Sequence, residues 1–208
     1  MSPSATPAGE LVARLRETPV RPAQIAALLD GAGHAERLAA IRALARGEQR
    51  ALYRAVDGFA PARLVDLVPA ATGDLVPVRH HGRNTLPAFS RFEKRFCRPR
   101  GGDAEKPDEL YGYNFQPTAL LRPLTGPGYF LAVEDPNRAE VLIDYRRVPA
   151  GELPAGWPPL RPNDVGLARF VYGYMLDTLR RVSQHVSIGS AARRGRDLGS
   201  WFVLCRES

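Results

Sequence analysis

The densest group of residues able to do chemistry is the run His80–Asn84, which is His-His-Gly-Arg-Asn. A histidine can act as an acid, a base or a ligand near neutral pH, and Arg83 can bind a carboxylate or a phosphate. Adjacent side chains of a strand point to opposite faces, so His80 and His81 can share a pocket only where the strand breaks. The run is interpreted either as part of a site or as a solvated turn.

Another histidine, His185, comes after the helix expected from Asn163 to Arg181. It alternates with Ser183 and Ser187 on the polar side of the strand expected over Val182–Ile188. That side faces either solvent or the polar lining of a cavity. No local spacing supports a metal site built from His80, His81 and His185, because HExxH-type patterns are absent. We therefore expect no metal and no cofactor.

Two acids, Glu93 and Asp144, occupy the centres of predicted strands, where lone charges are unusual. Each has basic neighbours, such as Arg95 and Arg146, so cross-strand ion pairs explain both acids. If both face one cavity, they become candidates for acid/base work with His80 or His81.

Aromatic side chains alternate along Leu110–Gln116, where Tyr111, Tyr113 and Phe115 share one face. Beside Arg95 they could form a stacking platform for single-stranded nucleic acid or a flat ligand. They could equally be the core-facing side of a sheet, since aromatics favour strands. The RNP signatures of an RNA-recognition domain, the P-loop, GxSxG and GxGxxG are all absent, so nucleic acid and nucleotides are not expected as partners.

Composition sets the broad class. The chain has 208 residues, a net charge of +7 carried almost wholly by arginine, and 44% hydrophobic residues. No apolar run is long enough for a transmembrane helix, and Met1–Gly9 does not resemble a secretory signal. Cys97 and Cys205 have no metal-type spacing and are expected to be buried thiols. We expect a basic, arginine-rich cytoplasmic protein without a membrane span.

The first 70 residues predict a helical region, because apolar residues recur at helical spacing between Pro and Gly breaks. This part contains only two of the seventeen aromatic residues, Tyr53 and Phe59. It is expected to be an accessory, or to dock a protein partner through residues 10–56. The expected helices are Gly9–Glu17, Pro22–Asp30, His34–Ala45, Glu48–Val56 and Pro61–Leu67.

Residues 75–208 predict an antiparallel body of about six strands that can curl into a half-barrel. One long covering helix is expected from Asn163 to Arg181, with Leu167, Val171, Met175 and Leu179 on its apolar stripe. The fold class is therefore α+β. The expected strands are Leu75–His80, Arg91–Arg98, Leu110–Gln116, Gly128–Glu134, Ala139–Val148, Val182–Ile188 and Trp201–Arg206.

The end of the chain, with Val186–Gly189, a basic turn and Trp201–Leu204, resembles the closing hairpin of lipocalin-like plastid lipid-associated proteins. The resemblance covers about twenty residues and the rest of the chain does not match. It implies a barrel that binds an apolar ligand.

Together these patterns favour a non-catalytic binding protein that holds a small amphipathic or anionic molecule in a sheet-lined cavity. One alternative is an interaction or scaffold protein that docks through its N-terminal helices, and another is a small acid/base enzyme using His80 or His81. The candidate ligand-binding residues are His80, His81, Arg83, Asn84, Arg95, Tyr111, Tyr113, Tyr145 and His185.

Overall fold

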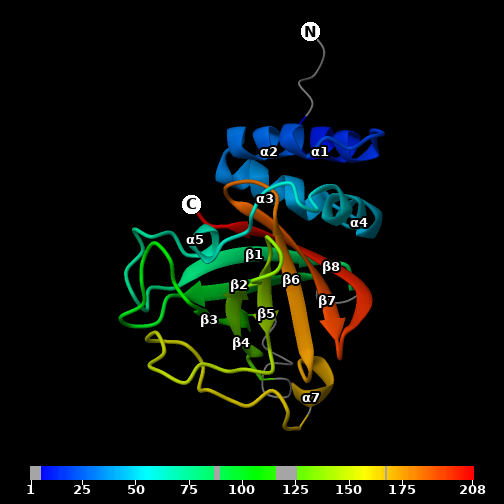
Figure 1. The fold of residues 1–208 in the computed structure, drawn as a ribbon. Coiled ribbons are helices and arrows are strands. Elements are labelled where there is room, and N and C mark those ends of the chain that lie inside the picture. The colour runs from blue at the N-terminus through cyan, green and yellow to red at the C-terminus, as the bar shows by residue number, and fades with distance from the viewer. Residues whose placement is uncertain (1–5, 87–89, 116–125, 167) are drawn as a thin grey trace.

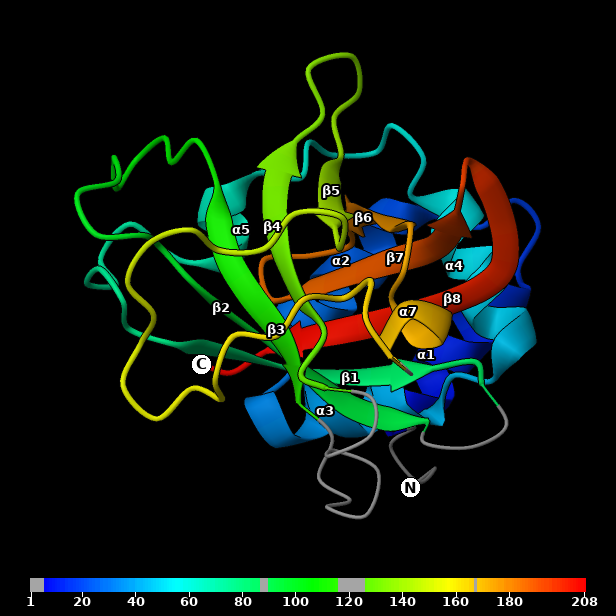
Figure 2. The ribbon, with the colours of Figure 1, turned by 90° about the horizontal axis from the view of Figure 1, so that it is seen from below.

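The structure is a computed structural model that describes residues 6–86, 90–115, 126–166 and 168–208. Its body is a closed barrel of eight antiparallel strands, in which each strand pairs with its neighbours in sequence and the last pairs with the first (Figures 1 and 2). The strands are β1 Val78–Asn84, β2 Arg91–Cys97, β3 Leu110–Phe115, β4 Tyr129–Glu134, β5 Val141–Asp144, β6 Met175–Arg181, β7 Val186–Arg193 and β8 Arg196–Arg206.

This barrel corrects the predicted half-barrel of about six strands with one long covering helix. The segment expected to be that helix contains only the short α7, Ala168–Val171, followed directly by strand β6. Tyr174 has a left-handed φ of 61°, which ends helical geometry there. The first strand is also displaced, because it runs over Val78–Asn84 rather than Leu75–His80, so the His80–Asn84 run is strand and not turn.

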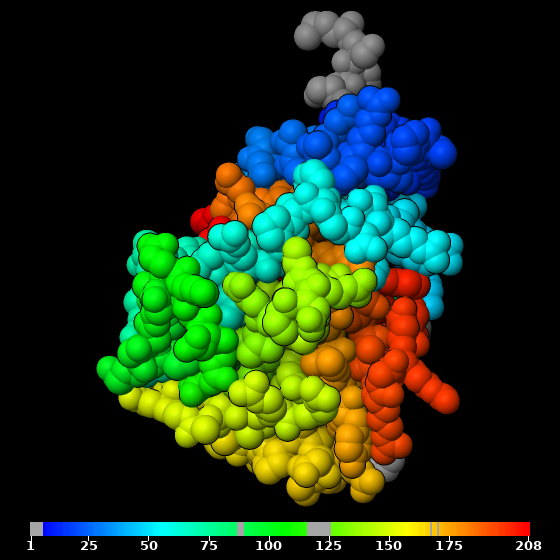
Figure 3. Space-filling view, viewed as in Figure 1, coloured from blue at the N-terminus to red at the C-terminus, as the bar shows by residue number. Residues whose placement is uncertain are grey.

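The helical region was predicted correctly as helical. Helices α1 to α4 form a layer beside β7 and β8, and Figure 3 shows this layer seated on the barrel. Pro22 starts α2 at a position where a missing N–H is harmless. The helices are α1 Pro7–Arg16, α2 Pro22–Gly31, α3 His34–Ala43, α4 Arg46–Ala55 and α5 Leu64–Leu67.

The contact between helices and barrel is an apolar cluster. Leu29, Ile41 and Leu44 lie in the same buried cluster as Ile188 and Val203 of the barrel's outer surface. Burying each such side chain contributes roughly 1.5–3 kcal/mol. The apolar side of the helices is thus used within the chain, and docking of a partner through residues 10–56 stays a prediction.

Inside the barrel, three glycines make room for three phenyl rings. Gly82 lies opposite Phe92, and Gly112 lies opposite Phe130 on the adjacent strand. A Cβ atom would stand 2.6 Å from the ring at Gly82 and 2.3 Å from the ring at Gly112. Gly189 faces Phe202 in the same way. These pairs fill the barrel with aromatic side chains, as expected for a small closed barrel.

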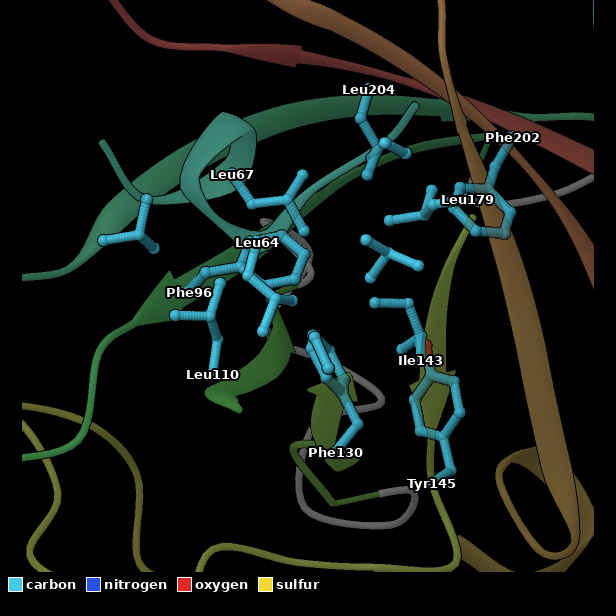
Figure 4. Packing of buried hydrophobic residues seen from close by; sticks show 14 of the residues in the cluster. Leu64, Leu67, Phe96, Leu110, Phe130, Ile143, Tyr145, Leu179, Phe202 and Leu204 are labelled. Atoms are coloured by element: carbon cyan, nitrogen blue, oxygen red, sulfur yellow. The ribbon is translucent and has the colours of Figure 1, made fainter. Parts of the chain in front are cut away.

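Helix α5 closes one end of the barrel. Leu64 and Leu67 belong to the interior cluster, and Figure 4 shows them over the rings of the core, away from Tyr145. The opposite end lies beside α7 (Figure 2). Cys97 and Cys205 are both buried and free, as predicted. Among the described residues, no helix is long and apolar enough to cross a membrane.

Candidate functional site

Strand alternation separates the two histidines of β1. His80 points into the barrel, where its Nε2 donates a hydrogen bond to the carbonyl oxygen of Leu67 at 2.9 Å. Its ring meets Phe96 edge-on at 4.9 Å between centroids. Burial lowers the pKa of His80 to about 3, so the imidazole is neutral near pH 7. His80 therefore attaches α5 to the barrel.

His81 points outward and lies in a surface ion-pair group. Its Nδ1 lies 3.8 Å from Glu93, and its Nε2 lies 3.8 Å from Glu207. Arg95 also contacts Glu93, with hydrogen bonds of 3.0 and 2.9 Å. Cross-strand ion pairing thus accounts for Glu93, while His80 lies on the other side of the sheet. Glu93 and His80 do not share a cavity.

The other polar candidates of β1 hold local structure. Arg83 donates a hydrogen bond to the backbone oxygen of Arg42 in the helical layer. Asn84 accepts one from the backbone N–H of Leu86 at 3.0 Å. Asp144, on β5, is bound by Arg146 through two hydrogen bonds of 2.8 Å.

Tyr111 and Tyr113 lie on the outside of the barrel, although both are buried. The crossover between β5 and α7 covers them, with Trp157 at 4.8 Å from Tyr113 between ring centroids. Arg95 stacks on Phe115 at 4.1 Å. Trp157 therefore lies on the aromatic face that the alternation predicted, and the structure does not bring these rings together with Tyr145.

His185 lies at the α5 end of the barrel. It lines a pocket of about 20 Å³ together with His80 and Ser187. This volume is enough for one water molecule. His185 Nδ1 and Ser187 Oγ are buried without a hydrogen-bond partner among the described residues. Of the nine candidates, only His80 and His185 share this pocket.

A polar cluster in the barrel interior was missed by the sequence reasoning, except for Tyr145. Its centre is Lys94 of β2, which is only 2% exposed. Lys94 Nζ donates a hydrogen bond to the side-chain oxygen of Asn114 at 3.0 Å and another to the hydroxyl of Tyr145. The Asn114 amide also donates to Tyr145, at 3.0 Å. Two neighbouring polar side chains, Asn114 and Tyr145, thus meet around one ammonium group.

The counter-charge of Lys94 comes from Asp177 on β6, which is 3% exposed. Its Oδ2 lies 3.7 Å from Lys94 Nζ, which is longer than a hydrogen bond. The other oxygen, Oδ1, is buried without a hydrogen-bond partner among the described residues. A buried acceptor without a partner is costly, so this carboxylate is incompletely satisfied.

Aromatic rings surround the ammonium group. Lys94 Nζ lies 4.9 Å from the ring centres of Phe130 and Tyr145, and 5.0 Å from that of Phe202. These distances allow cation–π attraction, which strengthens when the cation is desolvated. Figure 4 shows the three rings within the barrel core.

Burial shifts the pKa values of the cluster. Desolvation lowers the pKa of Lys94 to about 8, although Asp177 opposes this effect. Desolvation also raises the pKa of Asp177 to about 6, and it raises the pKa of Tyr145 well above its ordinary value. Perturbed groups gathered in one place are typical of functional sites. Burial thus moves the pKa values of Lys94 and Asp177 towards each other.

The ring of Tyr172 closes the cluster from the α7 end. It stacks on Tyr145 with 5.6 Å between centroids and an interplanar angle of 15°. Burial raises the pKa of its hydroxyl to about 12, and the Asn114 side chain opposes this shift. Tyr172 lies between the short α7 and the left-handed Tyr174. Its ring is thus carried by a connection and not by a strand of the barrel.

A sequence signal for this cluster existed in part. Alternation along the predicted strand Arg91–Arg98 puts Phe92, Lys94 and Phe96 on one face, and a lysine between two core phenylalanines is unusual. Asp177 carried no such signal, because its segment was predicted to be helix. Among the described residues, no group of three His, Cys, Asp or Glu side chains could hold a metal ion.

The fold and the cluster define an up-and-down β-barrel with a charged, aromatic-lined interior. Searches against family models, curated proteins and solved structures found no significant match.

Proposed function

We propose that the protein is a non-catalytic binding protein whose barrel holds a small, flat, amphipathic molecule beside Lys94. One observation carries this proposal. A lysine and an aspartate are both buried among aromatic rings, and one oxygen of the aspartate has no hydrogen-bond partner among the described residues. A buried ion pair stabilises a fold less well than apolar side chains of similar volume. A ligand that completes the hydrogen bonds of the cluster would explain why both charges are buried.

The position of the Tyr172 ring defines the slot for this ligand. The ring stacks on Tyr145, so a planar molecule of similar size would make the same stacking contact. Because Tyr172 belongs to a connection with a left-handed residue close by, its ring can be displaced without breaking the sheet. The 20 Å³ pocket lies at the other end and is too small for this role.

The cluster also specifies the polar end of the ligand. Lys94 supplies a cation that favours an acceptor oxygen, and Asp177 Oδ1 favours a donor. The ring walls favour an apolar body, since small-molecule sites combine apolar surface with few polar groups. The predicted ligand is thus an aromatic-sized molecule with an oxygen-containing head.

Ligand-detected NMR with benzyl alcohol and benzoate tests the proposal. We expect both probes to bind the wild-type protein, and Tyr172→Ala to strengthen binding about tenfold, because the slot is then already open. Tyr174→Ala is the matched control, since that ring is exposed two residues away and its loss leaves the affinity unchanged. If neither probe binds wild-type protein or Tyr172→Ala, the proposal is wrong.

A further inference from the structure

Lys94 differs chemically from an ordinary surface lysine. Its Nζ is surrounded by aromatic rings, and Oδ2 of Asp177 lies 3.7 Å away. With its pKa near 8, roughly a tenth of Lys94 is neutral amine at pH 7, whereas an ordinary lysine is neutral in well under about one molecule in a thousand. A neutral, desolvated amine is a nucleophile towards carbonyl carbon.

We propose that Lys94 binds a small aldehyde or ketone covalently, as an imine formed inside the barrel. This inference rests on the proposed function, because the carbonyl compound must first occupy the slot of Tyr172. It narrows the oxygen-containing head of the ligand to a carbonyl group.

The cluster contains the groups that this reaction needs. Asp177 takes a proton from the Lys94 ammonium, the amine then attacks the carbonyl carbon, and an N–C bond forms while the carbonyl π electrons move to oxygen. The oxygen and the nitrogen exchange protons through Asp177, which gives a neutral carbinolamine and a protonated carboxyl group. Asp177 then returns its proton to the hydroxyl group, the C–O bond breaks, and water leaves as the nitrogen lone pair forms the C=N bond.

Charge is conserved over the whole reaction, because the ammonium group and the carbonyl compound become an iminium ion and water. The iminium cation takes the place of the ammonium beside Asp177, whose carboxylate is unchanged at the end. Asp177 Oδ2, 3.7 Å from Lys94 Nζ, is the oxygen placed to accept and return the protons. Its raised pKa suits this exchange near neutral pH.

Lys106 provides an internal comparison, because Lys94 and Lys106 are the only lysines of the chain. Lys106 lies exposed in the connection between β2 and β3. Its ammonium group is solvated, unlike that of Lys94. Selectivity for Lys94 at neutral pH would therefore report the barrel site and not general lysine chemistry.

The test incubates the full-length protein with benzaldehyde and sodium cyanoborohydride, followed by intact mass measurement and peptide mapping. We expect one adduct on Lys94, with a mass gain equal to that of benzaldehyde less one oxygen atom. Its rate should increase with pH and level off above about pH 8. Lys106→Met should be labelled as the wild type is, while Lys94→Met should lose the adduct. Peptide mapping of the wild type gives the same answer should Lys94→Met fail to fold.

Benzyl alcohol separates this inference from the proposed function. Competition between benzyl alcohol and the Lys94 label supports both. If benzyl alcohol binds but benzaldehyde labels only Lys106 or the N-terminus, imine formation is refuted and the binding proposal stands. If benzyl alcohol does not bind and Lys94 is not labelled, both are wrong.

Discussion

At the scale of single residues, Lys94 and Asp177 determine the chemistry of the barrel interior and also lower its stability. Burial removes both charges from water, and their separation of 3.7 Å compensates only in part. The pH dependence of stability should therefore reveal the pair.

We expect this pair to destabilise the fold most between about pH 6 and pH 8. The pKa of Lys94 falls from 10.5 to about 8 on folding, so between these values the native state binds fewer protons and its stability rises with pH. The pKa of Asp177 rises from 3.8 to about 6, so stability falls as pH rises through that interval. Over each of these two pH intervals, the free energy of unfolding should change by an amount on the order of 3 kcal/mol.

Urea denaturation of the wild type and of a Lys94→Met/Asp177→Leu double variant measures this effect. The difference in free energy of unfolding should favour the double variant most between pH 6 and pH 8, and shrink on both sides. His80, whose pKa is also lowered by burial, is present in both proteins and cancels. A difference that does not vary with pH would contradict the assigned pKa directions.

The sequence analysis predicted the position of Lys94 but not that of Asp177. Lys94 was placed on the strand face of Phe92 and Phe96, which the structure confirms. Asp177 was missed because Val171, Met175 and Leu179 also fit a helix, and a short apolar pattern does not distinguish the two periods. The expected alternation also separates the two histidines of β1, because the strand does not break there and His80 lies inside while His81 lies outside.

At the scale of elements, the four-residue helix α5 closes the barrel. Leu67 is buried in the interior cluster, and its carbonyl oxygen accepts the hydrogen bond of His80. The backbone N–H of Leu64 donates to Glu134 at 3.0 Å, and Asp66 pairs with Arg181 at 3.3 Å. Such a short helix depends on these tertiary contacts.

Leu67→Ala should therefore destabilise the protein by about 2–5 kcal/mol, the usual range for removing a buried leucine. Leu86→Ala is the matched control, because Leu86 is 51% exposed and its loss should change the free energy of unfolding by less than about 0.5 kcal/mol. Thermal or urea unfolding measures both. Equal effects of the two substitutions would show that α5 does not contribute to the core.

The strand faces show what sequence patterns could not decide. Val186 and Ile188 of β7 are the apolar side of their strand, yet they point outward, where the helical layer covers them. Likewise Tyr111 and Tyr113 point outward under Trp157. In a barrel covered on its outside, both faces of a strand can be buried, so alternation alone does not show which face is inside.

At the scale of the whole molecule, closure of the barrel depends on pairing between β1 and β8, which are more than a hundred residues apart. Local patterns carry no information about such a contact, which explains why the sequence predicted an open sheet. The Gly82–Phe92, Gly112–Phe130 and Gly189–Phe202 pairs explain how the closed barrel accommodates its rings.

The shared cluster of helices and barrel predicts that both unfold together. The sequence suggested a helical region over residues 1–70 and a body over 75–208, which would allow two separate transitions. The structure instead puts Leu29 in one buried cluster with Val203 and Cys205 of β8. Elements that share a core are expected to unfold cooperatively.

Urea unfolding followed by two probes tests this prediction. Far-ultraviolet circular dichroism at a helix-sensitive wavelength reports mainly the helices. In a Trp201→Phe background, fluorescence reports the barrel, because Trp157 packs on Tyr113 of β3, whereas Trp201 lies 5.5 Å from the guanidinium of Arg46 in α4. The two transitions should coincide in this background. Leu29→Ala should lower both midpoints equally, because it removes about 2–5 kcal/mol from a core that both parts share. Loss of the helical signal at lower urea, with an unchanged tryptophan transition, would show instead that the helical layer folds independently of the barrel.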